Sequence, residues 1–149
     1  MNRRAGLIVD PVRRSGRYGL RYRSSVLHGD MPTEGGANVE TILVIDDQDR
    51  VRVVIREMLQ MRGYTVLDTG DPQIALDLTK KHAIHLLLAD VVMPLMTGPE
   101  LARRVQALSP QTKVLLMSGS SVSDASGYPF IAKPFTPDAL AARVRQVLA

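Results

Sequence analysis

The chain of 149 residues is long enough for one ordinary domain, and its apolar fraction of 45% and charged fraction of 23% are typical of soluble globular proteins. It has no cysteine, which excludes disulfides and thiolate metal sites, and no apolar run approaches the roughly 18 residues that a membrane helix requires. No apolar stretch follows the arginines near the N-terminus, so we expect no secretory signal, no membrane association and a cytoplasmic protein.

The first 38 residues differ in composition from the rest of the chain. They hold seven arginines and three acidic residues, so they account for the whole net charge of +4. This Arg-, Gly- and Ser-rich segment cannot bury enough apolar area to offset its ordering entropy. We expect residues 1–38 to be a disordered basic tail, of which residues 1–30 are absent if translation starts at Met31, and its charges are too sparse to predict nucleic-acid binding.

From Glu40 onward, short apolar runs alternate with segments whose apolar residues recur at helical spacing. The apolar runs predict strands at 41–45, 64–67, 85–89, 113–117 and 130–132. The helical patterns lie at 51–59 before Gly63, at 71–81 after the Asp71 cap, at 101–108, and at 137–148 after the Thr136 cap. Strands alternating with helices predict one doubly wound, five-stranded parallel sheet in an α/β domain over residues 39–149.

One connection is too short for the expected pattern. Only ten residues, Gly119 to Tyr128, separate Ser118 from Pro129, and they are mostly Gly and Ser. Parallel strands normally need a crossover of a dozen residues or more, usually with a helix. We therefore expect the fourth helix to be reduced to about a turn or to be missing.

Polar side chains follow four of the five predicted strands. The set is Asp46 and Asp47 after the first strand, Asp90 after the third, Ser118 after the fourth and Lys133 after the fifth. Because functional groups of open α/β sheets gather at the carboxyl ends of the strands, we expect these side chains to share one pocket.

Three carboxylates in one pocket repel each other and require a cation. Only oxygen ligands are available, which favours Mg²⁺ over softer metals. A carboxylate beside Mg²⁺ and a lysine ammonium can attack a phosphorus atom, while both cations stabilise the phosphoryl oxygens. The residues therefore predict reversible aspartyl phosphorylation.

Four segments in order resemble the receiver domain of two-component response regulators, which has a flavodoxin-like (βα)5 fold. They are Ile-Leu-Val-Ile-Asp46-Asp47, Leu-Leu-Ala-Asp90-Val-Val-Met-Pro94-Leu-Met-Thr-Gly98, Val-Leu-Leu-Met-Ser118-Gly119 and Phe130-Ile-Ala-Lys133-Pro134-Phe135. The resemblance spans about residues 40–149. Among receiver domains, this part of the chain resembles those of the chemotaxis regulators.

The resemblance implies a role for each matched residue. Asp90 would be the phosphoacceptor, and Asp47 and Asp90 would bind Mg²⁺ directly with the backbone carbonyl of Val92, while Asp46 would act largely through water. Ser118 would be the switch hydroxyl, and Lys133 would pair with the phosphoryl group or with Asp90. Lys133-Pro134 matches the family's cis peptide. Phe130 matches the aromatic switch residue but lacks the hydroxyl of the more common tyrosine.

Taken singly, these residues have ordinary explanations. Asp46, Asp47 or Asp49 could cap a helix, Asp90 and Ser118 could belong to turns, Lys133 could be a solvated lysine, and Phe130 could be part of the core. Their joint placement at one sheet edge favours the site.

We expect a phosphoacceptor that signals by conformational change, with a histidine kinase or phosphotransfer protein as donor and an unknown protein as downstream target. It would not be an enzyme beyond its own phosphorylation and dephosphorylation, and we expect no output domain after Ala149. The family commonly dimerises through the face made by the fourth helix, the fifth strand and the last helix. Because we expect the fourth helix to be reduced or missing here, we expect a monomer or weak dimer. The alternatives are a pseudo-receiver that only binds a partner and a haloacid-dehalogenase-like phosphohydrolase. Against the latter, Gln48 stands two residues after Asp46, where that family has an acid.

Overall fold

The computed structural model describes residues 39–119 and 127–149, which form one parallel sheet with two layers of helices. The tail 1–38, and most of the segment expected to hold a reduced fourth helix or none, lie outside the described residues, so both expectations stay predictions. No helix in the described ranges has the length and apolar character needed to cross a membrane.

The five strands are short and ordered β2-β1-β3-β4-β5, with every neighbouring pair parallel; the first four are mostly buried, whereas β5 is half-buried to exposed. Their bounds are β1 Thr41–Ile45, β2 Thr65–Thr69, β3 Leu86–Asp90, β4 Lys113–Ser118 and β5 Phe130–Ala132. This is the flavodoxin-like strand order, so the expected fold class is confirmed. Their apolar runs predicted these strands because both faces of the sheet are covered.

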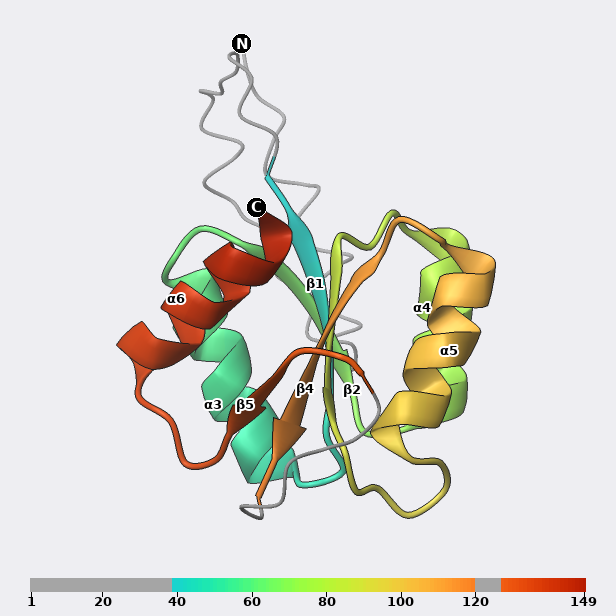
Figure 1. Cartoon of the computed structure of the whole chain (residues 1–149), viewed down its shortest axis with the longest axis horizontal. Helices are drawn as coiled ribbons and strands as arrows, with labels where there is room; N and C mark the ends of the chain where they lie inside the picture. Colours follow the sequence, from blue (N-terminus) through green and yellow to red (C-terminus); the bar gives the residue numbers. More distant parts are fainter. Residues whose placement is uncertain (1–38, 120–126) are drawn as a thin grey trace, which may run out of the picture.

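Two helices cover each face of the sheet (Figure 1). The helices are α3 Asp49–Gln60, α4 Pro72–Lys81, α5 Gly98–Leu108 and α6 Pro137–Leu148. Helices α3 and α6 share one core cluster with alternate strand residues such as Val44 and Leu88, whereas α4 and α5 share the other with Ile45 and Ala89. The alternation of side chains along each strand therefore divides the core into two halves.

Capping residues set the helix starts, largely as the sequence predicts. Asp71 accepts a hydrogen bond from the Gln73 amide at 2.8 Å, and Thr136 accepts one from the Ala139 amide at 3.0 Å. Helix α3 differs, because its N-cap is Gln48, which makes no side-chain capping bond. The aspartates before it are thus not used as its cap.

Several strands extend beyond their expected ends. Asp90 pairs with Met117, and Ser118 pairs with Ala132, so each is the last residue of its strand rather than the first residue after it. Strand β2 begins at Thr65 rather than Tyr64 and continues through Asp68 to Thr69. Pairing with β1 continues over these residues, so the end of the apolar run does not mark the end of the strand.

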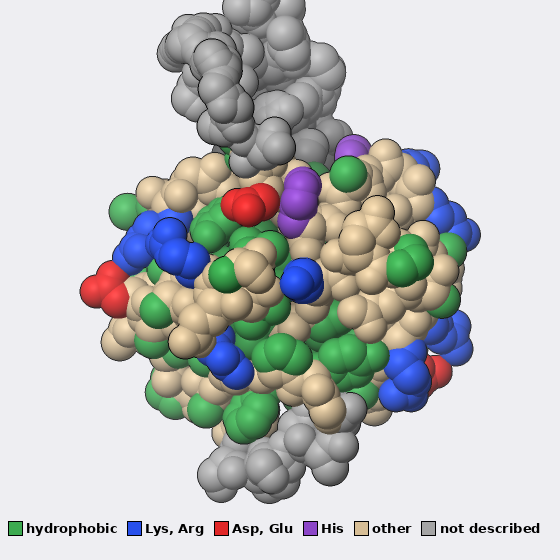
Figure 2. Space-filling model, turned by 45° about the horizontal axis from the view of Figure 1, so that its top comes forward, with side chains coloured by type: hydrophobic (Ala, Val, Ile, Leu, Met, Phe, Trp, Pro, Cys, Tyr) green, Lys and Arg blue, Asp and Glu red, His purple; other side chains and the backbone are tan. Residues whose placement is uncertain are grey.

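Figure 2 shows the upper side of the molecule, where apolar, basic, acidic and histidine side chains are intermixed. Lysine and arginine side chains are spread over this face and do not gather in one patch. A shallow hollow lined in part by Glu40, His85 and Lys113 lies at the amino edge of the sheet. The aspartates that follow the strands lie at the opposite, carboxyl edge.

Candidate functional site

Three aspartates converge at the carboxyl ends of β1 and β3. One carboxylate oxygen from each of Asp46, Asp47 and Asp90 lies within 4.8 Å of the others. Strands β1 and β3 are neighbours, and the helices that follow them, α3 and α5, lie on opposite faces of the sheet. Ligand sites of open α/β sheets occur at such a reversal, because the diverging connections leave a crevice there.

Asp46 is fully buried, yet its carboxylate and backbone carbonyl all have partners. Its Oδ1 accepts a hydrogen bond from the Gln48 amide at 2.9 Å, and its Oδ2 accepts one from Lys133 Nζ at 3.1 Å. Its backbone carbonyl accepts one from Arg52 Nη1 at 2.7 Å. A buried carboxylate is costly unless it is paired, so this bonding makes the position possible.

Asp90 is held between its own loop and the lysine, with 14% of its side chain exposed. Its Oδ1 accepts a hydrogen bond from the Val92 amide at 3.2 Å, and its Oδ2 accepts one from Lys133 Nζ at 2.8 Å. The loop is packed tightly against the start of α5, where a Cβ added to Gly98 would lie 2.4 Å from the Asp90 carbonyl oxygen. Glycine is therefore required at position 98 for this approach.

Lys133 follows β5 and joins Pro134 through the expected cis peptide bond. Its ammonium bridges Asp46 and Asp90, while its backbone amide donates to the Ser118 carbonyl at 2.8 Å. Burial alone would lower the pKa of Lys133, but the hydrogen bonds and attraction of the two carboxylates outweigh it and raise that pKa above its ordinary value. The ammonium is therefore a permanent cation at neutral pH.

The two expected switch residues lie on the strands beside the aspartates. Ser118 is buried at the end of β4, one residue beyond the partner of Asp90. Phe130 is half-buried on β5 and packs against the core cluster shared by α4 and α5. Phe130 lies on the expected strand, whereas Ser118 is the last residue of β4 rather than the first residue after it. The roles of both residues in switching stay predictions.

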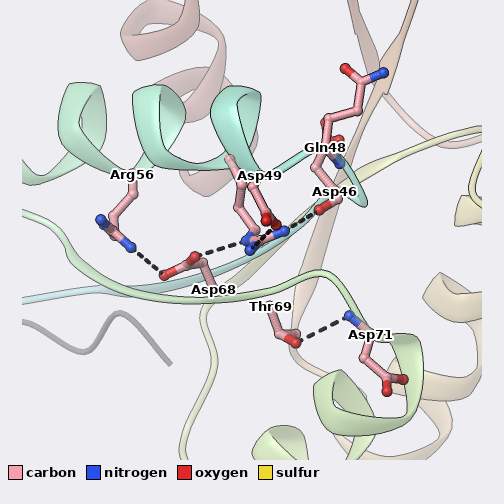
Figure 3. Close-up of polar contacts among 8 residues, drawn as sticks. Asp46, Gln48, Asp49, Arg56, Asp68, Thr69 and Asp71 are labelled. Carbon is pink, nitrogen blue, oxygen red and sulfur yellow. Dashed lines mark hydrogen bonds and ion pairs between the residues drawn. The ribbon is translucent and has the colours of Figure 1, made fainter. Parts of the chain in front are cut away.

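The sequence interpretation missed two arginines next to the aspartates. Asp68, at the end of β2, is almost fully buried and accepts hydrogen bonds from Arg52 Nε at 3.0 Å and from Arg56 Nη1 at 3.1 Å. Figure 3 shows the Asp68 side chain pointing toward Arg56 and the helix α3. The available signal was the spacing of Arg52 and Arg56, which at i and i+4 lie on one face of the helix.

The three-aspartate cluster fits Mg²⁺. All its potential ligands are carboxylate oxygens, which a hard cation prefers. Oxygens on one octahedral Mg²⁺ lie no more than about 4.2 Å apart. The three carboxylate oxygens lie within 4.8 Å of one another, which is close to that span. Asp47 and Asp90 are accessible and suit direct coordination, whereas Asp46 is buried behind them with both oxygens already bonded.

Comparison with known proteins points to one family. Residues 42–145 match the family described as "Response regulator receiver domain". The chain is 33% identical over 115 residues to the probable transcriptional regulator ycf27 of Porphyridium aerugineum, covering 73% of this chain and 48% of the relative. It is also 33% identical over 118 residues to the sensor kinase CckA of Brucella abortus, covering 72% and 12%. The chain thus spans less than half the length of these two relatives.

Solved structures agree with this match. The receiver domain of the hybrid histidine kinase CckA superposes with a TM-score of 0.65 at 35% identity, covering 73% of this chain and 99% of that one. The chemotaxis protein CheY4 of Vibrio cholerae superposes with a TM-score of 0.70 at 28% identity, covering 74% and 100%. In both cases the similarity covers nearly the whole of the solved chain.

Proposed function

Since this chain belongs to the response regulator receiver domain family of two-component signalling, we propose that Asp90 accepts a phosphoryl group while Mg²⁺ is held by the three-aspartate cluster. The observation that carries the proposal is the convergence of three carboxylates and one ammonium. Lys133 Nζ lies 2.8 Å from Asp90 Oδ2 and 3.1 Å from Asp46 Oδ2. This arrangement surrounds one accessible carboxylate with the groups that phosphoryl transfer requires.

The proposed donor is a phosphohistidine of a histidine kinase or phosphotransfer protein. A carboxylate oxygen of Asp90 forms a bond to phosphorus, the P–N bond breaks, and the imidazole leaves with the electron pair. Mg²⁺, when bound, supplies positive charge that offsets the carboxylates and the phosphoryl oxygens. Asp47, Asp90 and the carbonyl of Val92 would hold the ion directly, and Asp46 would hold it largely through water.

The protein's own groups orient the Asp90 carboxylate for the reaction and then interact with the phosphoryl group attached to it. The Val92 amide and Lys133 hold the two oxygens of Asp90, which leaves the carboxylate directed and partly exposed. Lys133 then pairs with the phosphoryl oxygens, and the Ser118 hydroxyl donates to them, with Phe130 following its movement. Hydrolysis by water restores Asp90, so the protein acts on its own phosphoryl group and not as an enzyme with a separate substrate.

We further propose that the protein is cytoplasmic, acts as a monomer or weak dimer and signals to a protein target. The support for the oligomeric state is the short connection between Ser118 and Pro129, which leaves little chain for a helix that the family uses in dimerisation.

The test is the intact mass of the full chain after incubation with acetyl phosphate and Mg²⁺. We expect one added phosphoryl group that requires Mg²⁺ and disappears in Asp90→Asn. Asp77→Asn is the matched control, because Asp77 is an exposed acid on α4. No adduct on the wild type, even with brief sampling, would favour the pseudo-receiver alternative. Continuous turnover of a generic phosphatase substrate would instead favour a phosphohydrolase.

A further inference from the structure

Arg52 connects three parts of the molecule that meet beside the three-aspartate cluster. Its Nη1 donates to the backbone carbonyl of Asp46 at 2.7 Å, at the end of β1. Its Nε donates to Asp68 Oδ2 at 3.0 Å, on β2, and its Nη2 donates to Asp49 Oδ1 at 2.7 Å, in the first turn of α3. Each nitrogen of the guanidinium thus has a different acceptor, which only the forked geometry of arginine permits.

The space for this guanidinium comes from a glycine at the end of β2. A Cβ added to Gly70 would lie 2.8 Å from Arg52 Nη1 and 3.4 Å from the Asp46 carbonyl oxygen. Any other residue at this position would compete with the guanidinium for its place. Arg52 is 15% exposed and Asp68 is 4% exposed, so the bond between them is shielded from water, whereas the bond to Asp49 lies at the surface.

The bond to the Asp46 carbonyl bears directly on Asp47, because that carbonyl belongs to the peptide that joins the two residues. Asp47 is exposed, and within the described parts of the chain its carboxylate has no hydrogen-bond partner. The direction of the Asp47 side chain is therefore set mainly by its backbone. Two side-chain contacts hold this backbone: the Asp46 carboxylate accepts from the Gln48 amide at 2.9 Å, and Arg52 donates to the Asp46 carbonyl at 2.7 Å.

We propose that Arg52 is a positioning residue that fixes the Asp46–Asp47 turn for binding of a divalent cation, by holding the Asp46 carbonyl. This inference rests on the proposed function, since the cation is the Mg²⁺ of that site. The effect is geometric, because the positive charge of Arg52 already faces the carboxylates of Asp68 and Asp49. A bare positive charge here would repel the cation, so the pairing lets Arg52 act without that penalty.

Arg56 offers a matched control on the same face of α3. It also donates to Asp68, with its Nη1 3.1 Å from Asp68 Oδ1, but it has no bond to the Asp46 carbonyl (Figure 3). Arg56→Met therefore removes an ion pair to the same buried acid and leaves the Asp46–Asp47 turn held. Arg52→Met removes an ion pair to Asp68 and also the bond that holds the Asp46 carbonyl.

The experiment is calorimetric titration of the Mg²⁺-free full chain with MgCl₂, without any phosphoryl donor. Loss of a group that orients metal ligands weakens metal binding by about 10- to 100-fold, so we expect Arg52→Met to raise the Kd for Mg²⁺ at least about tenfold. Arg56→Met should bind Mg²⁺ like the wild type. With acetyl phosphate, Arg52→Met should need more Mg²⁺ but reach the wild-type extent of phosphorylation at saturation.

Two further variants test whether Arg52 affects Mg²⁺ binding through its hydrogen-bond geometry, rather than through its charge or through an effect on folding. Arg52→Lys keeps the charge but loses the fork, so it should bind Mg²⁺ as weakly as Arg52→Met. Gly70→Ala keeps every charge and displaces the guanidinium, so it should weaken Mg²⁺ binding even if Arg52→Met fails to fold.

Equal Mg²⁺ affinity in Arg52→Met and Arg56→Met, or in folded Gly70→Ala and the wild type, would overturn the inference while leaving the proposed function intact. Recovery of affinity by Arg52→Lys would also overturn it, since charge alone would then suffice. Failure of the wild type itself to bind Mg²⁺ would overturn both the proposed function and this inference.

Discussion

Removal of the Lys133 ammonium tests the electrostatic basis of the site. In Lys133→Met the side chain keeps a similar length and apolar stem but loses its charge and its two hydrogen bonds, at 3.1 Å to Asp46 and 2.8 Å to Asp90. The two carboxylates then face each other without a counter-ion. We expect the free energy of unfolding to fall in Mg²⁺-free buffer.

The size of the loss follows from the burial of the two acceptors. A hydrogen bond to a charged group contributes about 1.5–3 kcal/mol, and the buried Asp46 cannot replace its bond with water. Asp90 is partly exposed and recovers part of its loss by hydration. Breaking a fully buried pair costs about 3–5 kcal/mol, and Lys133 is 20% exposed, so we expect about 2–4 kcal/mol for the variant.

Urea unfolding with and without Mg²⁺ measures this loss. Lys80→Met is the control, because Lys80 is exposed near the end of α4 and has no acidic partner within the described ranges. Mg²⁺ should stabilise Lys133→Met more than the wild type, since the ion replaces the missing positive charge. Equal unfolding free energies for the wild type and Lys133→Met without Mg²⁺ would refute the counter-ion role. Absence of Mg²⁺ stabilisation in both would refute the cation site.

Three further predictions concern the loop, the lysine and the assembly. Gly98→Ala places a Cβ 2.4 Å from the Asp90 carbonyl oxygen, so urea unfolding should show a loss of about 1–3 kcal/mol and phosphorylation should slow. Gly119→Ala, whose Cβ would have no atom of the described residues within 4 Å, should change stability far less. Because the folded-state pKa of Lys133 is raised, its stabilisation is complete below the unfolded value of about 10.4 and is lost as pH rises through the folded value. The stability difference between wild type and Lys133→Met should therefore stay constant near neutral pH and shrink in alkaline buffer; a difference that grows with pH contradicts this. Sedimentation of the phosphorylated protein should show no strong dimer, and a tight dimer would contradict the inference from the short connection at 119–128.

The sequence predicted those features that depend on short-range patterns. Each buried strand has a continuous apolar run, and Asp71 and Thr136 cap their helices as their positions indicate. The convergence of Asp46, Asp90 and Lys133 followed from strand alternation alone, because parallel strands bring their carboxyl ends to one edge. Strand ends were less predictable, since the backbone pairing that extends β3 to Asp90 depends on Met117 of a neighbouring strand.

The arginine contacts beside the site could not be predicted in the same way. In the sequence, Asp68 resembles a polar residue that terminates a strand, and Arg52 and Arg56 resemble the solvated face of an amphipathic helix. Their pairing depends on where α3 lies over the end of β2, which is a tertiary property. The need for glycine at position 98 could not be predicted from the sequence either, because the atom that excludes a side chain there is the carbonyl oxygen of Asp90.

The charges at the carboxyl edge of the sheet explain why one divalent cation suits it. Arg52 and Arg56 are close by, but their charges face Asp68 and Asp49. Among the residues that the structure describes, Lys133 is the one cation that bonds to the carboxylates of the three-aspartate cluster, so two of their three negative charges are left uncompensated. A divalent ion supplies that difference. In the proposed reaction the phosphoryl group then adds further negative charge at Asp90. In this proposal the added charge attracts the Ser118 hydroxyl at the end of β4 and the Lys133 ammonium after β5, so it would act on the strands farthest from β2.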